Sequence, residues 1–506
     1  MSFKKNVIFN YCGHFYTVTI NIIVIPSYLH YLGAASFGLI SIYVVMQSWL
    51  SLLNIGFIPA LSREVAFYRS QKNGFFQARQ LLRSLEIIFL LVNFLVMFGV
   101  VFSSHWIAHH WLKVQNLTYS EVMHCIVLMG VITSFRWFSD LYRAGISGME
   151  EQVWLNSISV VITTLRCGGA YVFLRWVTRM PVHFFEYQLL IAVIESILLS
   201  VKCYKIIPLL ENFSLGLNVS WGLIKKVFPF AFGLFYTTTL WILLSQSDKL
   251  ILSHILPLTI YGYFALVTII SGGILQCAMP INLALLPRMT HLLSQGKKEE
   301  MLQIYRNATQ LVVVILFPLI GIVAMFSTQV IYIWTGDNIA ANWAGPILFW
   351  YALGTGFMCV SIFQFYLQFA MGNLKLHVIS YTVFTLITVP LIFYFAYHEG
   401  AKGVAITLFL MQGVLFFIWP PVIHRKYAPG IHSRWLLKDI FPIATVVLIA
   451  LLCVKKIPIH FELISRGGGF IILSGLVFFV LLAGASASTI CRDYFTTFVR
   501  EKSVSA

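Results

Sequence analysis

Charged residues are scarce in this chain. Of its 506 residues only 10% are Asp, Glu, Lys or Arg, whereas 59% are hydrophobic. A soluble protein of this length needs polar surface over several domains, and no Pro/Gly/Ser-rich linker or low-complexity run separates domain-sized stretches. These absences exclude an ordinary soluble fold and favour one large membrane domain.

Acidic residues are scarcer than basic ones, with 18 Asp and Glu against 34 Lys and Arg. A basic excess can indicate nucleic-acid binding. Here, however, the basic residues form short clusters between apolar stretches, where the positive-inside rule places them. We therefore expect no nucleic-acid partner.

Motifs for metal, redox or nucleotide chemistry are also missing. The eight cysteines stand singly in apolar segments, without a CxxC pair or a histidine at metal-ligand spacing. His105, His109 and His110 stand beside tryptophans in a short interfacial turn. No GxxxxGK[ST] string occurs, and Gly296-Lys297-Lys298 follows no predicted strand. We expect no metal, no cofactor and no ATP hydrolysis.

Apolar windows of about 20 residues, the length of helix that crosses a bilayer core, recur along the whole chain. Lys4 and Lys5 precede the first window as in a signal peptide, but that window spans a full membrane thickness and others follow, so we expect it to be retained. Backbone groups in hydrocarbon need internal hydrogen bonds, so each window predicts a helix. The predicted spans lie near 6–31, 36–60, 82–104, 122–145, 155–178, 184–207, 227–250, 260–287, 307–331, 343–370, 376–397, 403–423, 439–454 and 469–489.

These windows predict an all-α polytopic membrane protein of about 14 transmembrane helices. With an even number of spans both termini lie in the cytoplasm, and most lysines and arginines then fall at cytoplasmic ends. Omitting one span would invert every later loop and destroy that asymmetry. The basic loops are 63–83, 202–226, 288–306 and 425–438.

An internal repeat appears at an offset of about 224 residues. The copies have the same orientation because an even number of spans separates them, which predicts two six-helix lobes in parallel repeat around a central cavity. We expect an N-terminal lobe over 1–210, a second over 211–438, and two extra peripheral helices over 439–506. The aligned residues are Phe37-Gly38 with Tyr261-Gly262, Gly148 with Gly372, and Ser70 with Ser294.

Polar residues follow one stripe in two repeat-related spans, which should not face lipid. Such stripes line a cavity or pack helices together, because small polar residues often hydrogen-bond between membrane helices. The stripes are Asn6, Asn10, His14, Thr17 and Asn21 in span 1, and Gly233, Thr237, Trp241, Ser245 and Asp248 in span 7.

Charges within spans are the strongest site candidates. Arg136, Asp140 and Arg143 share one face of span 4, and Arg166 lies near the middle of span 5. A mid-bilayer arginine costs about 2.5–3.5 kcal/mol on insertion scales, so it usually faces a wet interior or a counter-charge. Asp140 is either a structural ion-pair partner or part of a binding site, whereas Arg166 has no obvious local partner and is the best candidate for an anionic ligand.

Further candidates are less specific. Glu195 is a carboxylate that titrates during transport or pairs with an arginine. Asp248 and Lys249 lie near the periplasmic end of span 7, where the lysine lines the cavity or anchors at the interface. Arg63 and Arg288, which correspond in the repeat, are candidates for coupling or gating, as is Glu195.

Four stretches carry a resemblance to a known family. They resemble polysaccharide-export flippases of the O-antigen (Wzx) type, in the multidrug/oligosaccharidyl-lipid/polysaccharide exporter superfamily. Asn54 departs from the aspartate expected in similar sequences, whereas Arg63 and Glu64 match the family's turn after its second helix. The stretches are YLGAASFGLISIY (Tyr31–Tyr43), QSWLSLLNIGFIPALSREVAFY (Gln47–Tyr68), GISGMEEQVWLNSI (Gly145–Ile158) and QSDKLILSHILPLTIYGYFAL (Gln246–Leu266).

The resemblance implies an inner-membrane flippase that moves an undecaprenyl-diphosphate-linked oligosaccharide to the periplasmic leaflet, with membrane lipid and polysaccharide polymerase machinery as partners. A diphosphate headgroup would explain the buried arginines. A multidrug antiporter of the same fold would need acidic groups in the cavity to bind a cation. A membrane glycan polymerase or ligase would need a large extramembrane loop, and the turns near 105–121 and 455–468 are too short. We therefore expect transport and not catalysis.

Overall fold

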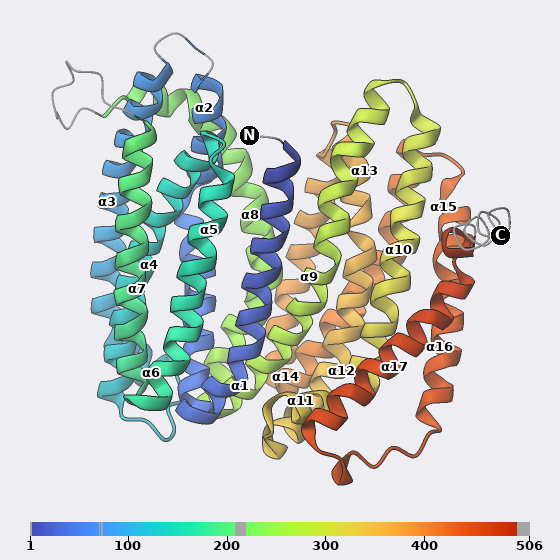
Figure 1. Ribbon diagram of the computed structural model, residues 1–506. Helices are drawn as coiled ribbons and strands as arrows, with labels where there is room; N and C mark the ends of the chain where they lie inside the picture. Colours follow the sequence, from blue (N-terminus) through green and yellow to red (C-terminus); the bar gives the residue numbers. More distant parts are fainter. Residues whose placement is uncertain (1–2, 70, 72–73, 208–218, 493–506) are drawn as a thin grey trace, which may run out of the picture. The chain divides into compact units, whose positions relative to one another are not determined.

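A computed structural model describes residues 3–69, 71, 74–207 and 219–492, although not the side chains of residues 3–12, 14, 282 and 283. In these ranges the chain consists of helices joined by short loops, without a strand (Figure 1). Among the described residues, eleven helical stretches are long and apolar enough to cross a membrane. The predicted all-α polytopic membrane fold is confirmed.

Residue contacts divide the chain into two compact units, Met1–Gly262 and Tyr263–Ala506, which we call unit 1 and unit 2. Helix α9 (Leu258–Ser294) runs across the boundary. Unit 1 holds α1 (Phe3–Leu50), η1 (Ser51–Asn54), α2 (Phe57–Arg69), α3 (Gly74–Trp106), η2 (Ile107–Trp111), α4 (Tyr119–Gly148), α5 (Gln152–Thr163), η3 (Thr164–Gly169), α6 (Ala170–Trp176), α7 (Pro181–Ile206) and α8 (Trp221–Ile255). Unit 2 holds α10 (Lys298–Met325), α11 (Ser327–Thr335), α12 (Asn338–Ser361), α13 (Phe363–Ala370), α14 (Lys375–Tyr427), α15 (Ile431–Arg434), η4 (Trp435–Ile440), α16 (Phe441–Lys455), η5 (Phe461–Leu463) and α17 (Arg466–Ala487).

Helices α1 and α14 each contain two predicted spans. At 1.5 Å per residue a straight helix of about 50 residues would be more than twice as long as a bilayer core is thick. Each is divided by a glycine in the left-handed region, Gly33 with φ 79° and Gly400 with φ 62°, which other residues rarely adopt. In Figure 1 the blue ribbon of α1 runs to the far end of unit 1 and returns toward α2. Counting these halves separately and adding α7 accounts for the fourteen predicted spans.

One predicted boundary is wrong. The span expected near 36–60 ends at Asn54, and a separate helix, α2, begins at Phe57. The chain turns between them because Ile55 and Gly56 both have positive φ, of 46° and 69°. An isoleucine in this region is strained, and nothing in an apolar run signals it.

The parallel repeat is visible in the helix boundaries. Helix α3 begins at Gly74 and α10 at Lys298, whereas α5 begins at Gln152 and α14 at Lys375. Both pairs keep the offset of about 224 residues that the sequence indicated. The starts of these two helix pairs therefore fit the predicted repeat.

Repeat-related glycines pack reciprocally within unit 1. A Cβ on Gly38 would overlap the carbonyl oxygen of Leu258, and one on Gly262 would overlap the carbonyl oxygen of Ala34. Ala34 and Leu258 are themselves repeat equivalents, so the contact has local twofold symmetry. Small residues allow such close approach of helix backbones.

We expect Gly38→Ala and Gly262→Ala each to lower the amount of folded protein in the membrane, because the new methyl group meets a backbone carbonyl that cannot turn aside. Gly99→Ala is the matched control, since a Cβ there meets nothing within 4 Å. Membrane protein level and melting temperature in detergent measure the effect. Equal behaviour of all three variants would contradict the proposed close packing.

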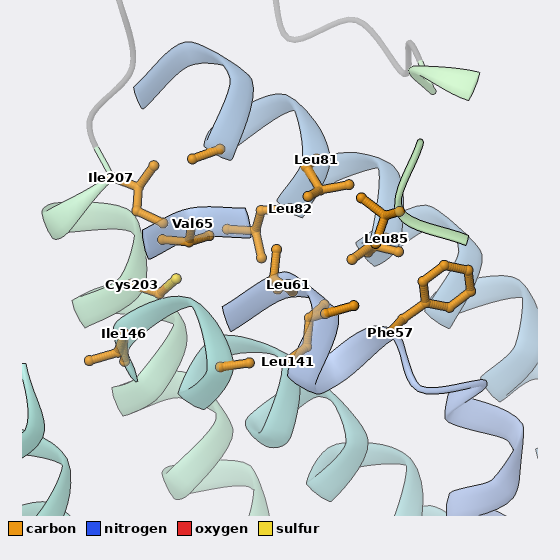
Figure 2. Close-up of a cluster of buried hydrophobic side chains, with 14 of the residues drawn as sticks. Phe57, Leu61, Val65, Leu81, Leu82, Leu85, Leu141, Ile146, Cys203 and Ile207 are labelled. Carbon is orange, nitrogen blue, oxygen red and sulfur yellow. The ribbon is translucent and has the colours of Figure 1, made fainter. Parts of the chain in front are cut away.

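An apolar cluster fixes one end of unit 1 (Figure 2). Helix α2 is amphipathic, and its apolar face packs onto the ends of α3, α4 and α7. Burying such side chains stabilises by about 25 cal/mol per Å² of apolar surface. This cluster therefore holds α4 and α7, which carry most of the membrane-embedded charges, in a fixed register. Its labelled members are Phe57, Leu61, Val65, Leu81, Leu82, Leu85, Leu141, Ile146, Cys203 and Ile207.

A buried polar network joins the last helices of unit 2 to α10. Arg306 donates two hydrogen bonds, of 2.6 and 2.9 Å, to the carboxylate of Asp439 on η4. Gln310 donates to the same carboxylate at 2.7 Å and accepts a hydrogen bond from Ser488 at 2.9 Å. The helices without a repeat partner are thus docked by satisfied polar groups as well as by apolar packing.

Candidate functional site

A charged cavity of about 460 Å³ lies within unit 1. Five segments line it: the second half of α1, η1, α4, η3 and α7. It brings together three of the predicted site residues, Arg136 and Asp140 on α4 and Arg166 on η3, and adds Glu195 from the gating candidates. The lining residues are Gln47, Ser48, Ser51, Thr133, Arg136, Trp137, Ser139, Asp140, Arg143, Arg166 and Glu195. We call this cavity the arginine pocket.

Helix α4 supplies the central face of the pocket. A capping box starts this helix, since Thr118 accepts from the backbone N–H of Glu121 while the Glu121 side chain accepts from the backbone N–H of Thr118. From this start Arg136, Asp140 and Arg143 fall on one face at steps of four and three residues. The predicted common face is therefore the face toward the pocket.

Arg143 makes the ion pair of the pocket. Its guanidinium donates to Glu195 on α7 at 2.6 Å and to the Ser159 hydroxyl on α5 at 2.7 Å. Glu195 is buried, with 8% of its surface exposed. The geometry fits the ion-pair interpretation of Glu195, and it ties α4, α5 and α7 together.

Arg136 is held without a carboxylate. It donates to the side-chain oxygen of Gln47 at 3.1 Å and lies over the Tyr43 ring, 5.4 Å from its centroid. Gln47 in turn donates to the Tyr43 hydroxyl at 2.9 Å. The Nε atom of Arg136 is buried and has no hydrogen-bond partner in the described residues.

The remaining charged residues of the arginine pocket are Asp140 and Arg166. Among the described residues no ion pair joins Asp140 to Arg136 or Arg143, and none involves Arg166. Arg166 stands on η3, a π-helical segment in the middle of the fifth span. The arginine pocket therefore contains one formed ion pair and three further charges, two positive and one negative.

That excess of positive charge favours an anion. In a low-dielectric environment two guanidinium groups attract a phosphate or carboxylate far more strongly than in water. Arginine is also the residue that matches such groups in bidentate geometry. A small polar rim of serine, threonine and glutamine side chains offers additional hydrogen bonds.

The charge is confined to one copy of the repeat. At the same offset, the positions in unit 2 that correspond to the five charged residues carry neutral side chains. The backbone repeat alone therefore does not require charge there, and the charges at these positions belong to unit 1. The corresponding residues are Val360, Gln364, Leu367, Pro390 and Trp419.

Thr17 and Asn21, the members of the first span's polar stripe whose side chains the structure describes, do not line this pocket. Asn21 donates to the Thr17 carbonyl at 2.7 Å and accepts from the Cys167 thiol, on η3, at 3.3 Å. Its geometry matches the helix-packing interpretation. The side chains of Asn10 and His14 lie outside the described residues.

The remaining predicted residues are placed elsewhere. Lys249 pairs with Asp248 at 3.2 Å on α8, and Asp248 is only 1% exposed. Arg63 pairs with Glu64 at 3.3 Å and lies over a phenylalanine ring of α8, whereas Arg288 is exposed on α9. None of the four predicted residues lines the arginine pocket.

Sequence reasoning missed Gln47 and its neighbours on α1. Gln47 and Ser48 on α1 and Ser51 on η1 line the pocket, and Tyr43 lies under Arg136. The sequence did contain a pattern that indicates this site, because three polar residues close together in an apolar span usually face other helices or a cavity and not lipid. Their position opposite α4 depends on tertiary packing that the pattern does not reveal.

Comparison with known proteins gives two sequence matches. A family model described as "Polysaccharide biosynthesis protein" matches residues 3–293, more than half of the chain and all the segments that line the arginine pocket. A proposed O-antigen transporter of Shigella flexneri is 20% identical over 420 residues, which cover 80% of this chain and 94% of that protein.

Solved structures share the fold. The lipid II flippase MurJ, in an inward closed conformation, superposes with a TM-score of 0.68 at 14% identity, covering 97% of this chain and 99% of that chain. An inward-facing multidrug resistance transporter of the MATE family, in the MOP superfamily, gives a TM-score of 0.66 at 11% identity, covering 81% and 94%. At these identities the likeness concerns the fold.

Proposed function

The chain belongs to the polysaccharide biosynthesis protein family, and we propose that it is a flippase for a lipid-linked oligosaccharide in the bacterial inner membrane. The transported molecule would be an oligosaccharide repeat unit on undecaprenyl diphosphate, moved from the cytoplasmic to the periplasmic leaflet for O-antigen or another surface polysaccharide. Polysaccharide polymerase machinery would receive it.

The arginine pocket is the observation that carries this proposal. Arg136 and Arg166 line one cavity and have no carboxylate within ion-pairing distance among the described residues. A diphosphate would supply the missing negative charge and accept from both guanidinium groups. A cation-coupled multidrug antiporter would need the opposite balance, an excess of carboxylates, and this pocket does not provide it.

Transport would proceed by alternating access, with the arginine pocket open first to the cytoplasm and then to the periplasm. Arg63, Arg288 and Glu195 remain candidates for gating or coupling in this cycle. Asp248 and Lys249 would contribute to the path of the glycan. Because the described chain has no nucleotide-binding motif, gradients or mass action would drive the cycle.

Deleting the gene tests the proposal. We expect an undecaprenyl-diphosphate-linked oligosaccharide to accumulate on the cytoplasmic side, where mass spectrometry of the lipid extract identifies it. The wild-type gene on a plasmid should restore export, and the same plasmid with a premature stop codon should not. Unchanged lipid-linked glycan together with increased drug sensitivity would contradict the flippase and favour the antiporter.

The proposed orientation gives a separate prediction. Reporter fusions after residues 75, 150, 215, 298, 430 and 495 should report cytoplasm, whereas fusions after 113, 180, 338 and 460 should report periplasm, because the basic loops stay inside. Alkaline phosphatase and green fluorescent protein fusions at the same sites provide opposite readouts. A periplasmic C-terminus would contradict the fourteen-span topology.

A further inference from the structure

The helix that carries Arg166 is not regular at that point. Between α5 and α6 the chain forms the π-helical segment η3, Thr164–Gly169. A π-helical turn contains an extra residue, which widens the helix and leaves carbonyl groups without their usual α-helical donors. Inside a membrane each such carbonyl needs another donor, because no water is there to satisfy it.

Three side chains from other helices donate hydrogen bonds to carbonyls of this segment, one of which, that of Cys167, also accepts from the backbone N–H of Ala170. The Tyr187 hydroxyl donates to the carbonyl oxygen of Leu165 at 2.7 Å, and the Gln188 amide donates to that of Arg166 at 3.0 Å. The Tyr28 hydroxyl donates to that of Cys167 at 3.1 Å. Three consecutive carbonyls of η3 are thus held by α7 and α1, and Tyr28 and Gln188 are buried.

Gly169 makes room for one of these donors. A Cβ at Gly169 would overlap the Tyr187 hydroxyl, so glycine is required for that hydroxyl to reach Leu165. The neighbouring Gly168 is different, because the nearest atom to a Cβ there is a methyl group of Thr164 at 3.9 Å. The two adjacent glycines therefore have separable roles.

We propose that Tyr28, Tyr187 and Gln188 are positioning residues that hold η3 in its π-helical form and thereby aim Arg166 into the arginine pocket. An α-helix turns by about 100° per residue, so loss of the extra residue rotates the helix beyond it by about that angle. Arg166 would then point away from the pocket that it lines together with Arg136 and Asp140. This inference rests on the proposed function only in assigning a diphosphate to the pocket.

The repeat supports a special role for this point in the helix. In unit 2 the position that corresponds to Arg166 is Pro390, inside α14. Proline also removes a backbone hydrogen bond and distorts a helix. The described backbone of α14 stays helical at Pro390, so at this position of the repeat the π-helical turn, the charge and the side-chain donors occur together in unit 1.

The first test uses binding of inorganic diphosphate to the purified full-length protein, measured by calorimetry. Tyr187→Phe removes one hydroxyl and should weaken binding about fivefold, the loss expected for one neutral hydrogen bond. In an Arg166→Ala background the same change should have no further effect, whereas in an Arg136→Gln background the two effects should add. Additive losses in both backgrounds would overturn the positioning role.

The second test does not depend on any ligand. In a chain with its native cysteines replaced, Arg166→Cys places a thiol at this position, and its reaction rate with an anionic methanethiosulfonate reports exposure to the pocket. Adding Gly169→Ala should slow the reaction severalfold, whereas Gly168→Ala should leave it unchanged. Equal rates in the two glycine variants would overturn the inference.

The two tests separate the inference from the proposed function. If the wild-type protein binds no diphosphate but Gly169→Ala still slows thiol labelling, the positioning role stands and the diphosphate assignment is wrong. If diphosphate binds and neither the double-mutant cycle nor labelling shows the predicted pattern, the flippase proposal stands and the role of η3 is wrong.

Discussion

Arg166→Ala should abolish export of the lipid-linked glycan while the protein still accumulates in the membrane. An anionic headgroup would lose a charge-assisted contact of about 1.5–3 kcal/mol, which corresponds to roughly 10- to 150-fold in affinity. Arg166→Lys should rescue part of the activity, because the charge survives but the bidentate geometry does not. Surface glycan per cell and membrane protein level are the two measurements.

Arg175→Ala is the matched control for this variant. Arg175 lies on α6, nine residues along the same span, and donates to the Tyr171 hydroxyl at 2.9 Å in an exposed position. It does not line the arginine pocket, so export should stay near the wild-type level. Normal export by Arg166→Ala would make Arg166 structural or lipid-facing and remove the main residue from the proposed site.

The membrane fold could be predicted from the sequence because long apolar windows indicate which segments lie in the hydrocarbon core. The basic loops indicate which ends of those segments face the cytoplasm. The breaks at Gly33 and Gly400 fall in the gaps that the sequence predicted, between residues 31 and 36 and between 397 and 403. The end of the second span could not be predicted, because it depends on the positive φ of Ile55. Backbone conformation at one residue is decided by tertiary packing, to which an apolar pattern is insensitive.

The candidate site could be predicted only in part, because the sequence pattern gives the face of each helix but not the contacts between helices. Helical spacing places Arg136, Asp140 and Arg143 on one face, and it makes Asp140 the natural partner of either arginine. The ion pair instead joins Arg143 to Glu195, because α4 and α7 pack closely and their register sets these two groups 2.6 Å apart. Spacing within one helix cannot reveal a partner on another, nor could it reveal Gln47 beside Arg136.

Because Arg143 is paired with Glu195 and Arg136 is not paired with Asp140, double variants can test whether each arginine has a structural or a binding role. If Arg143 and Glu195 exist only to neutralise each other, the double variant Arg143→Gln/Glu195→Gln should be better tolerated than either single variant. A single change leaves one charge unpaired in the membrane, whereas the double change leaves none. We expect membrane protein level to fall in both single variants and to recover in the double variant.

The pair Arg136 and Asp140 should behave in the opposite way. No ion pair joins them in the described structure, and Arg136 is held by Gln47 and the Tyr43 ring. If Arg136 binds a diphosphate, Asp140→Asn should retain export, whereas Arg136→Gln should lose at least about tenfold, the lower limit for one charged hydrogen bond. The double variant should be as inactive as Arg136→Gln alone, because removing Asp140 cannot replace the missing cation.

Comparing the two double variants in one assay decides between a structural and a binding role for each arginine. Recovery of protein level by the Arg143 and Glu195 double variant shows that the assay detects an ion pair when one is present. Against that reference, restored export in the Arg136→Gln/Asp140→Asn variant would mean that Arg136 serves only to balance Asp140, and it would remove Arg136 from the diphosphate site. Continued loss of export at a normal protein level would leave substrate binding as the role of Arg136.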